Sequence, residues 1–297
     1  MPVQADFSQI SNLRSNLSWN FTGQVVAKLS LLLFHIYFAN LVGTRGYGEF
    51  SLVYVGGLIL VQPALDMGLN QLITKWVSRG NTEVIPLSFR IKSLIALGLV
   101  PIGLVIGWWI EVSLLLLVTV LGFFLINTLQ QSLFGILRGL EDLRPESLTV
   151  AMQNLLACAV ISIFSFLEIA EPWIGSFVLM LTRIAGTVVF SGIIWNKYLQ
   201  KIKKIESSSE LIESKKLWSE ALTLGFVLFL IQFYFRIDMI MLGVLASESE
   251  VGLYSVAYNL MEGTFFIPTI VMVAIFPRLS QAKHFSAYFH IGIRLLT

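Results

Sequence analysis

Residues 112–137, VSLLLLVTVLGFFLINTLQQSLFGIL, indicate most clearly the class of fold to which this chain belongs. Its 26 residues include no Asp, Glu, Lys or Arg, and polar residues do not alternate with apolar ones. As an α-helix it would be about 39 Å long, enough to cross the ~30 Å hydrocarbon core of a bilayer. A strand of a membrane barrel has only ~10 residues, of alternating polarity. Because a segment in lipid must satisfy its own backbone hydrogen bonds, this stretch predicts a transmembrane helix.

Seven further apolar runs repeat this pattern along the chain. Only 13% of the 297 residues are charged and 56% are hydrophobic, with a mean hydropathy of +0.79. A soluble domain has about 25% charged residues. The composition therefore predicts an all-α polytopic transmembrane helix bundle of about eight spans. The other seven spans are expected at residues 17–42, 50–73, 94–109, 148–167, 173–195, 221–245 and 252–276.

The distribution of Lys and Arg predicts the orientation of the bundle. Basic residues concentrate on the cytoplasmic side of membrane proteins. If the N-terminus is cytoplasmic, 16 of the 20 basic residues lie in cytoplasmic hinges or ends, whereas the opposite hinges carry Arg45 among several glutamates. We therefore expect both termini to be cytoplasmic, and we interpret the net charge of +2 as a topology signal rather than a nucleic-acid footprint. The 16 residues are Arg14, Lys75, Arg79, Arg90, Lys92, Arg138, Arg144, Lys197, Lys201, Lys203, Lys204, Lys215, Lys216, Arg278, Lys283 and Arg294.

A polar stretch divides six of the expected helices from the last two. Residues 197–219 carry lysines, glutamates and a serine triplet, a composition typical of a solvated linker that is helical in part at most. We therefore expect a first six-helix transmembrane bundle in residues 1–196, a cytoplasmic linker in 197–219, and the first two helices of a second bundle in 220–297.

An internal repeat supports this division. The chain reads GYGEFSLVY at residues 46–54 and EVGLYSVAY at residues 250–258. At an offset of 204 residues, Gly48 aligns with Gly252 and Ser51 aligns with Ser255. Each copy follows one apolar run and begins the next, which indicates duplication rather than chance similarity. Secondary transporters are commonly built from repeated halves with the substrate site between them.

Four segments, at residues 39–57, 66–80, 134–147 and 233–280, carry a resemblance to a known family. They resemble bacterial polysaccharide flippases of the multidrug/oligosaccharidyl-lipid/polysaccharide exporter superfamily. ANLVGTRGYGEFSLVYVGG and DMGLNQLITKWVSRG are similar to the first two helices of these proteins, and FGILRGLEDLRPES is similar to the exit of their fourth. The segment FYFRIDMIMLGVLASESEVGLYSVAYNLMEGTFFIPTIVMVAIFPRLS is similar to their seventh and eighth helices. The resemblance covers essentially the whole chain.

The resemblance implies a transporter of the bacterial inner membrane. Such flippases move polyprenyl-diphosphate-linked oligosaccharide across that membrane for polysaccharide biosynthesis, by alternating access between two six-helix halves. They usually have 12 to 14 helices, so the chain would be truncated to the first eight. We therefore expect the chain to need further helices from a partner chain. Membrane lipid and other polysaccharide assembly proteins are further expected partners.

Polar side chains inside the expected spans are the candidate site. A charge at the centre of a bilayer costs about 2.5–3.5 kcal/mol on insertion scales, so it seldom persists without a role. Lys28, Arg183 and Arg236 lie within spans, each beside further polar residues on one helix face. Given the flippase resemblance, we expect these cations to hold the diphosphate, since guanidinium groups bind phosphate oxygens in pairs. The expected substrate-binding residues are Lys28, Arg183, Arg236, Gln24 and Gln232.

Asp66, Glu262 and His35 also lie inside expected spans. We expect them to be coupling or ion-pair residues. Glu262 could pair with Arg236 or Lys28, and His35 fits a hydrogen-bonded packing residue better than a proton carrier. Three acidic residues, Asp66, Asp238 and Glu262, also lie in the spans and equal the three cations in number. Counting charges therefore does not decide the sign of the net charge of a cavity shared by the helices. A cation-coupled drug or metabolite antiporter of the same superfamily, with Asp66 and Glu262 as carriers, is therefore one alternative. A non-transporting membrane scaffold or truncated relic is another.

Enzymatic function is not expected from this sequence. His284 and His290 have no clustered Cys or carboxylate that would build a metal site. No Ser/His/Asp arrangement, paired-carboxylate site or nucleotide-binding domain is evident, so we expect no cofactor and no metal. Cys158 is the one cysteine, which excludes an internal disulfide.

Overall fold

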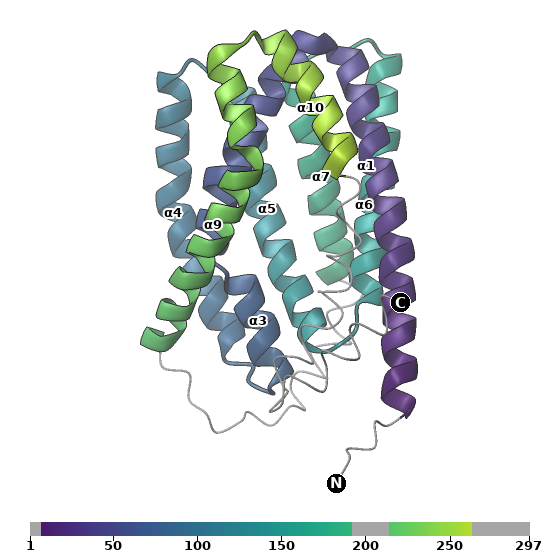
Figure 1. The fold of residues 1–297 in the computed structure, drawn as a ribbon, viewed down its shortest axis with the longest axis vertical. Coiled ribbons are helices and arrows are strands. Elements are labelled where there is room, and N and C mark those ends of the chain that lie inside the picture. The colour runs from purple at the N-terminus through teal and green to yellow at the C-terminus, as the bar shows by residue number, and fades with distance from the viewer. Residues whose placement is uncertain (1–6, 192–213, 263–297) are drawn as a thin grey trace.

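The computed structural model describes residues 7–191 and 214–262, with side chains from 21–191 and 217–261, as a bundle of helices (Figure 1). The described part contains helices but no β-strand, which confirms the all-α prediction. The elements are α1 (Phe7–Gly56), η1 (Gly57–Val61), α2 (Gln62–Asp66), α3 (Leu69–Ser78), α4 (Val84–Trp109), α5 (Leu114–Gly139), α6 (Arg144–Phe166), α7 (Trp173–Val189), α9 (Ser214–Leu245) and α10 (Glu248–Glu262).

The first two expected spans form one nearly continuous helical segment. Residues 21–78 would be about 87 Å long as a straight helix, far more than one crossing needs. The chain reverses at Gly43, whose φ of 70° and ψ of 173° interrupt the helical geometry inside α1. Glycine adopts this left-handed φ readily because it has no Cβ. A single backbone position therefore replaces the polar hinge that the hydropathy pattern predicts.

The helix of the second crossing is interrupted near its centre. The π-helical turn η1 leads into the five-residue helix α2, and Met67 (φ 44°) and Gly68 (φ 70°) are left-handed before α3 begins. A Cβ on Gly68 would lie 2.4 Å from the Cβ of Leu224 in α9, so the two segments cross in close contact. The break therefore lies where the first six helices meet the seventh.

Helix α4 begins ten residues earlier than the apolar run at 94–109 predicts. Lys92, which we assigned to a cytoplasmic hinge, is inside this helix and only 1% exposed. That assignment is wrong, because a basic residue at the edge of an apolar run can be buried against a partner on a neighbouring helix.

The remaining spans lie close to their predicted positions where they are described. Helices α5, α6, α7 and α9 fall in the fourth to seventh runs, and α10 covers the beginning of the eighth. The rest of that run, most of the linker at 197–219 and the side chain of Glu262 lie outside the described residues.

The outer surface of the bundle is apolar. Within the described part, the segments 21–78, 84–109, 114–139, 144–166 and 217–245 are long and apolar enough to cross a membrane, and Trp173–Val189 is a shorter apolar helix. Only 11% of the most apolar window of the 217–245 segment is buried. Inside, aromatic side chains of α1 stack edge to face around Phe38 and Phe50, which form part of the main core. The chain is an integral membrane protein, because such a surface is stable only in lipid.

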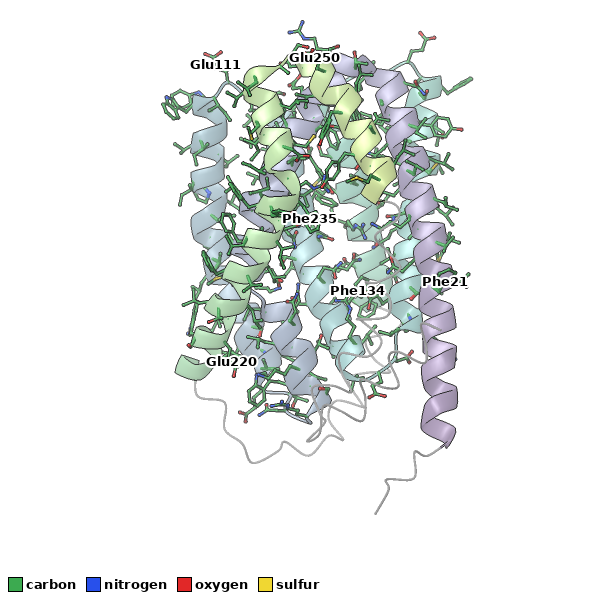
Figure 2. All side chains as sticks on the ribbon, viewed as in Figure 1. Phe21, Glu111, Phe134, Glu220, Phe235 and Glu250 are labelled. Atoms are coloured by element: carbon green, nitrogen blue, oxygen red, sulfur yellow. The ribbon has the colours of Figure 1, made fainter. Side chains whose placement is uncertain are left out.

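Charged side chains lie at both ends of the bundle: Glu111 and Glu250 at one end and Glu220 near the other (Figure 2). One end, called the acidic end below, carries glutamates that include Glu111 and Glu250. The opposite end, called the basic end, carries lysines and arginines together with carboxylates. These residues are Lys75, Arg79, Arg90, Arg138 and Arg144 and the acidic residues Glu83, Glu141, Asp142, Glu146 and Glu220.

At the acidic end the two copies of the sequence repeat pack against each other. A Cβ on Gly48 would lie 1.8 Å from the carbonyl oxygen of Glu248, and a Cβ on Gly252 would lie 2.1 Å from that of Thr44. Thr44 and Ser249 share a 2.6 Å hydrogen bond between their hydroxyls. The aligned glycines therefore allow α1 and α10 to touch backbone to backbone (Figure 1).

Ser247 and Glu250 form a capping box at the start of α10. The backbone N–H and the hydroxyl of Ser247 each donate to the Glu250 carboxylate at 2.8 Å. These hydrogen bonds stabilise the charged carboxylate and lower the pKa of Glu250 below its ordinary value. The box fixes the turn that directs α10 toward α1.

Candidate functional site: a cationic cavity between the helices

Among the described residues, only neutral amide groups hold the guanidinium of Arg183 on α7. Its guanidinium donates to the side-chain oxygens of Gln153 at 2.8 Å, Gln130 at 3.4 Å and Asn154 at 3.5 Å. Across residues 21–191 and 217–261, no carboxylate lies within ion-pair distance of it. The amides orient the guanidinium but do not neutralise it, so its environment favours an incoming anion.

Arg183 lines a polar cavity of about 380 Å³, called the arginine cavity below. Arg138 contributes a second guanidinium, and Tyr54 and two phenylalanines of α5 contribute aromatic surface. Most of the remaining lining consists of side-chain amides, which offer both donors and acceptors. These amides are Gln62, Asn70, Gln71, Asn127, Gln131 and Gln232.

A smaller cavity of about 200 Å³, called the lysine cavity below, lies between α1, α9 and α10. Lys28, His35 and Arg236 line it. The Arg236 guanidinium lies 4.6 Å from the ring centroid of Tyr258, a cation–π distance. Tyr54 and Leu58 line both cavities, so the lysine and arginine cavities adjoin.

His35 is part of a hydrogen-bonded group at the wall of the lysine cavity. Its Nδ1 lies 2.9 Å from the hydroxyl oxygen of Tyr47, which also accepts a 2.9 Å hydrogen bond from the Asn259 amide. His35 is 7% exposed and Tyr47 is 1% exposed. This group ties the first two crossings to α10.

The acidic residues whose side chains the structure describes lie away from both cavities. No Asp or Glu of the described part lines either of them. Asp66 pairs with Lys92 at 3.0 Å, and Asp238 accepts a hydrogen bond from the Tyr254 hydroxyl. Arg138 is neutralised by an ion pair with Glu146. The described residues therefore give the combined cavity a cationic lining, whereas counting charges in the sequence did not decide its sign.

The structure brings together most of the residues that the sequence singles out. Lys28, Arg236 and His35 line the lysine cavity, and Arg183 and Gln232 line the arginine cavity. Gln24 lies on α1 about one turn before Lys28 and does not line either cavity. Asp66 is 6% exposed in its pair with Lys92, and the side chain of Glu262 lies outside the described residues.

Several site residues were not predicted. Asn127 and Gln131 lie in the apolar run at 112–137, and both line the arginine cavity. Their position within a span was a usable signal, since intramembrane polar residues face the bundle interior. Lys92 gave a misleading signal, because its position at the edge of a run is also typical of a hinge.

A third cavity, of about 570 Å³, lies on the other face of η1 between α1, α4 and α5. Its lining is apolar apart from the carboxylates of Glu49, Glu111 and Glu248 near the acidic end. No Lys or Arg of the described part lines it, so it is not suited to an anion.

The fold and the cavities define the class: a polytopic helical membrane protein with a cationic, amide-lined interior cavity. A comparison with known proteins assigns the chain to a particular family within this class. It belongs to the family described as polysaccharide biosynthesis protein, whose family model matches residues 13–283. A comparison with curated proteins finds no match.

Two solved structures share the fold. One, described as protein A, aligns with a TM-score of 0.68 at 18% identity, over 91% of this chain. The other is the MATE multidrug transporter DinF-BH, solved in complex with a ligand, with a TM-score of 0.66 at 17% identity, also over 91% of this chain. The chain spans 65% of the length of each of these two structures.

Proposed function

We propose that this protein takes part in moving polyprenyl-diphosphate-linked oligosaccharide across the bacterial inner membrane. The observation that carries the proposal is the cationic lining that the described residues give the paired cavities, where Arg183 contacts only amides among them. A diphosphate supplies the negative charge that Arg183 lacks among these residues. Membership of the family of polysaccharide biosynthesis proteins supports the proposal that the diphosphate carries a sugar.

Lys28, Arg183 and Arg236 are the proposed diphosphate ligands. Arg183 approaches from the arginine cavity, and Lys28 and Arg236 approach from the lysine cavity on the other side of Tyr54. Two guanidinium groups offer planar pairs of N–H donors, which match the oxygens of a phosphate. The ammonium of Lys28 adds charge without such directionality.

The amides of the arginine cavity are the proposed sugar ligands. The side-chain oxygen of Gln71 is buried there and has no hydrogen-bond partner among the described residues. A buried acceptor without a partner costs free energy, and rotation of the Gln71 amide toward a sugar hydroxyl in the cavity would satisfy it. The volume of about 380 Å³ is in the ~300–1,000 Å³ range of small-molecule sites and suits the first sugars of a longer glycan.

Alternating access is the proposed mechanism. The contact between Gly48 and Gly252 closes the acidic end, and it joins the two copies of the repeat. Because rocking of repeated halves exposes a central site to each side in turn, this contact would have to separate when the cavity opens toward the acidic end.

The cationic lining favours an anionic cargo over a drug cation. A cation antiporter requires a carboxylate in reach of the cargo, and no carboxylate of the described residues lines the lysine or arginine cavity. A non-transporting scaffold would not need a cationic interior, because each buried cation carries a desolvation cost.

Polysaccharide export in cells tests the proposal. Arg183→Ala should abolish export in a complementation assay, and Arg183→Lys should retain part of it, because the charge survives without the planar fork. Arg79→Ala is the matched control, since Arg79 is an exposed basic residue outside both cavities. Normal export by an Arg183→Ala protein present at wild-type level would reject the proposed role and favour packing.

A further inference from the structure

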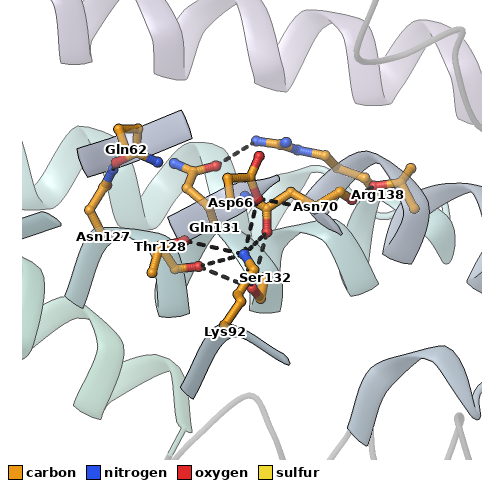
Figure 3. A network of polar contacts seen from close by, with 10 residues as sticks. Gln62, Asp66, Asn70, Lys92, Asn127, Thr128, Gln131, Ser132 and Arg138 are labelled. Atoms are coloured by element: carbon orange, nitrogen blue, oxygen red, sulfur yellow. Dashed lines mark hydrogen bonds and ion pairs between the residues drawn. The ribbon is translucent and has the colours of Figure 1, made fainter. Parts of the chain in front are cut away.

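The ammonium group of Lys92 occupies an oxygen cage inside the bundle (Figure 3). Its Nζ lies 3.0 Å from Oδ1 of Asp66, 2.8 Å from Oδ1 of Asn70 and 2.8 Å from Oγ of Ser132. The hydroxyl and carbonyl oxygens of Thr128 lie at 3.2 and 3.4 Å. These side chains come from α2, α3 and α5, whereas Lys92 enters from α4.

The cage offers more oxygens than one ammonium can use. Five oxygens surround Nζ, but a lysine has three N–H donors. A carboxylate, an amide oxygen, hydroxyls and a backbone carbonyl are also the usual ligands of hard cations. Distances of 2.8–3.4 Å exceed the ~2.0–2.6 Å of Mg²⁺ and Ca²⁺ sites, so the cage fits an ammonium ion better than a divalent metal.

The surrounding backbone has the form of an ion site. Asp66 is the last residue of α2, and the left-handed residues Met67 and Gly68 follow at once before α3. Broken membrane helices commonly coordinate cations in transporters. Asn70 joins the cage to the arginine cavity, because it accepts a hydrogen bond from Lys92 and also lines that cavity.

The cage is buried and balanced in charge. Lys92 is 1% exposed, Ser132 is 0% exposed and Thr128 is 2% exposed. Asp66 supplies its single carboxylate and Lys92 its single cation. Without the lysine head group, a buried anion would face four further oxygens and a void, an environment that strongly favours entry of a cation.

We propose that Lys92 is a tethered cation, which permanently fills a monovalent-cation site in the six-helix part of the chain. The site takes ammonium-like cations when the tether is removed. In the native protein it holds α2, α3, α4 and α5 together without any free ion. This proposal does not depend on the transported cargo.

Thermal unfolding of purified Lys92→Ala tests the proposal. The protein is compared at equal ionic strength in choline, sodium, potassium, ammonium and n-propylammonium chloride, the last of which replaces the missing side chain. In choline the melting temperature should fall on the order of 10 °C, because one partner of a buried ion pair is lost. Ammonium or n-propylammonium should restore at least half of that loss, whereas wild type should not distinguish these salts.

Two matched variants complete the experiment. Lys92→Met fills the cage with an uncharged chain of similar length, so it should be destabilised in every salt. Lys92→Ala combined with Asp66→Asn removes the anion, and its stability should not depend on the cation. If no cation stabilises Lys92→Ala, or if it cannot be purified in any of these salts, the tethered-cation proposal is rejected and Lys92 is a structural ion-pair partner only.

Discussion

Replacing Gly48 with alanine should separate the two copies of the repeat at the acidic end. The added Cβ would lie 1.8 Å from the carbonyl oxygen of Glu248 and 3.2 Å from the backbone nitrogen of Gly252. Both obstacles are backbone atoms, which cannot rotate away as a side chain can. To reach even a tight 3.0 Å contact, α10 must retreat by about 1.2 Å relative to α1. The hydrogen bond between Thr44 and Ser249 would then be lost or weakened.

The expected loss of stability follows from three contributions. Overpacking of a tight contact costs about 1–3 kcal/mol, and loss of a hydrogen bond costs about 1 kcal/mol. The higher helix propensity of alanine offsets about 1 kcal/mol. The net loss is about 1–3 kcal/mol, which lowers the melting temperature by roughly 3–10 °C for a protein of this size.

Gly98→Ala is the matched control for this measurement. Gly98 also lies inside a helix, but a Cβ there meets no atom within 4 Å. This variant should melt at or slightly above the wild-type temperature in the same detergent. If Gly48→Ala and Gly98→Ala melt at the same temperature, the glycine contact between α1 and α10 does not exist in the protein.

Two further predictions concern other polar contacts. Glu146→Ala should destabilise the protein by about 3–5 kcal/mol, because it leaves the part-buried guanidinium of Arg138 without its carboxylate; unfolding in detergent measures this loss, and a change below about 1 kcal/mol would contradict it. Ser247→Ala should raise the pKa of Glu250 toward its ordinary value of 4.5. Because the folded-state pKa of Glu250 is lowered, its contribution to stability is present above pH 4.5 and is lost as the pH falls through the folded-state value. The melting temperature of Ser247→Ala should therefore depend less on pH below 4.5 than that of wild type, and an unchanged dependence would contradict the capping box.

The helices were predictable because lipid imposes a strong rule on sequence. A span must be apolar over about 20 residues and must satisfy its own backbone, so hydropathy locates it without knowledge of its neighbours. The apolar run at 112–137 and the helix Leu114–Gly139 differ by two residues at each end. A reversal between the runs at 17–42 and 50–73 was predicted, but its form was not, because a single left-handed residue at Gly43 leaves no change in composition.

The site was predictable only in part, since pairing depends on which helix faces overlap. Arg183 and Arg236 stood out as isolated charges in apolar runs, and both line the cavities. Lys92 and Asp66 are 26 residues apart in sequence and come together only through the packing of α4 against the break after α2. Their pairing removes Asp66 from the set of candidate cavity carboxylates.

Equilibrium binding of a polyprenyl-diphosphate-linked sugar to the purified protein is a direct test of the proposed diphosphate site. Binding should require the diphosphate, so the uncharged polyprenol should bind far more weakly. Loss of a hydrogen bond to a charged group costs about 1.5–3 kcal/mol, so Arg183→Gln should weaken the affinity by about 10-fold to 150-fold. Arg79→Gln should bind as wild type does. Equal affinities for the diphosphate and the polyprenol, or an Arg183→Gln protein that binds as tightly as wild type, would rule out a diphosphate site at Arg183.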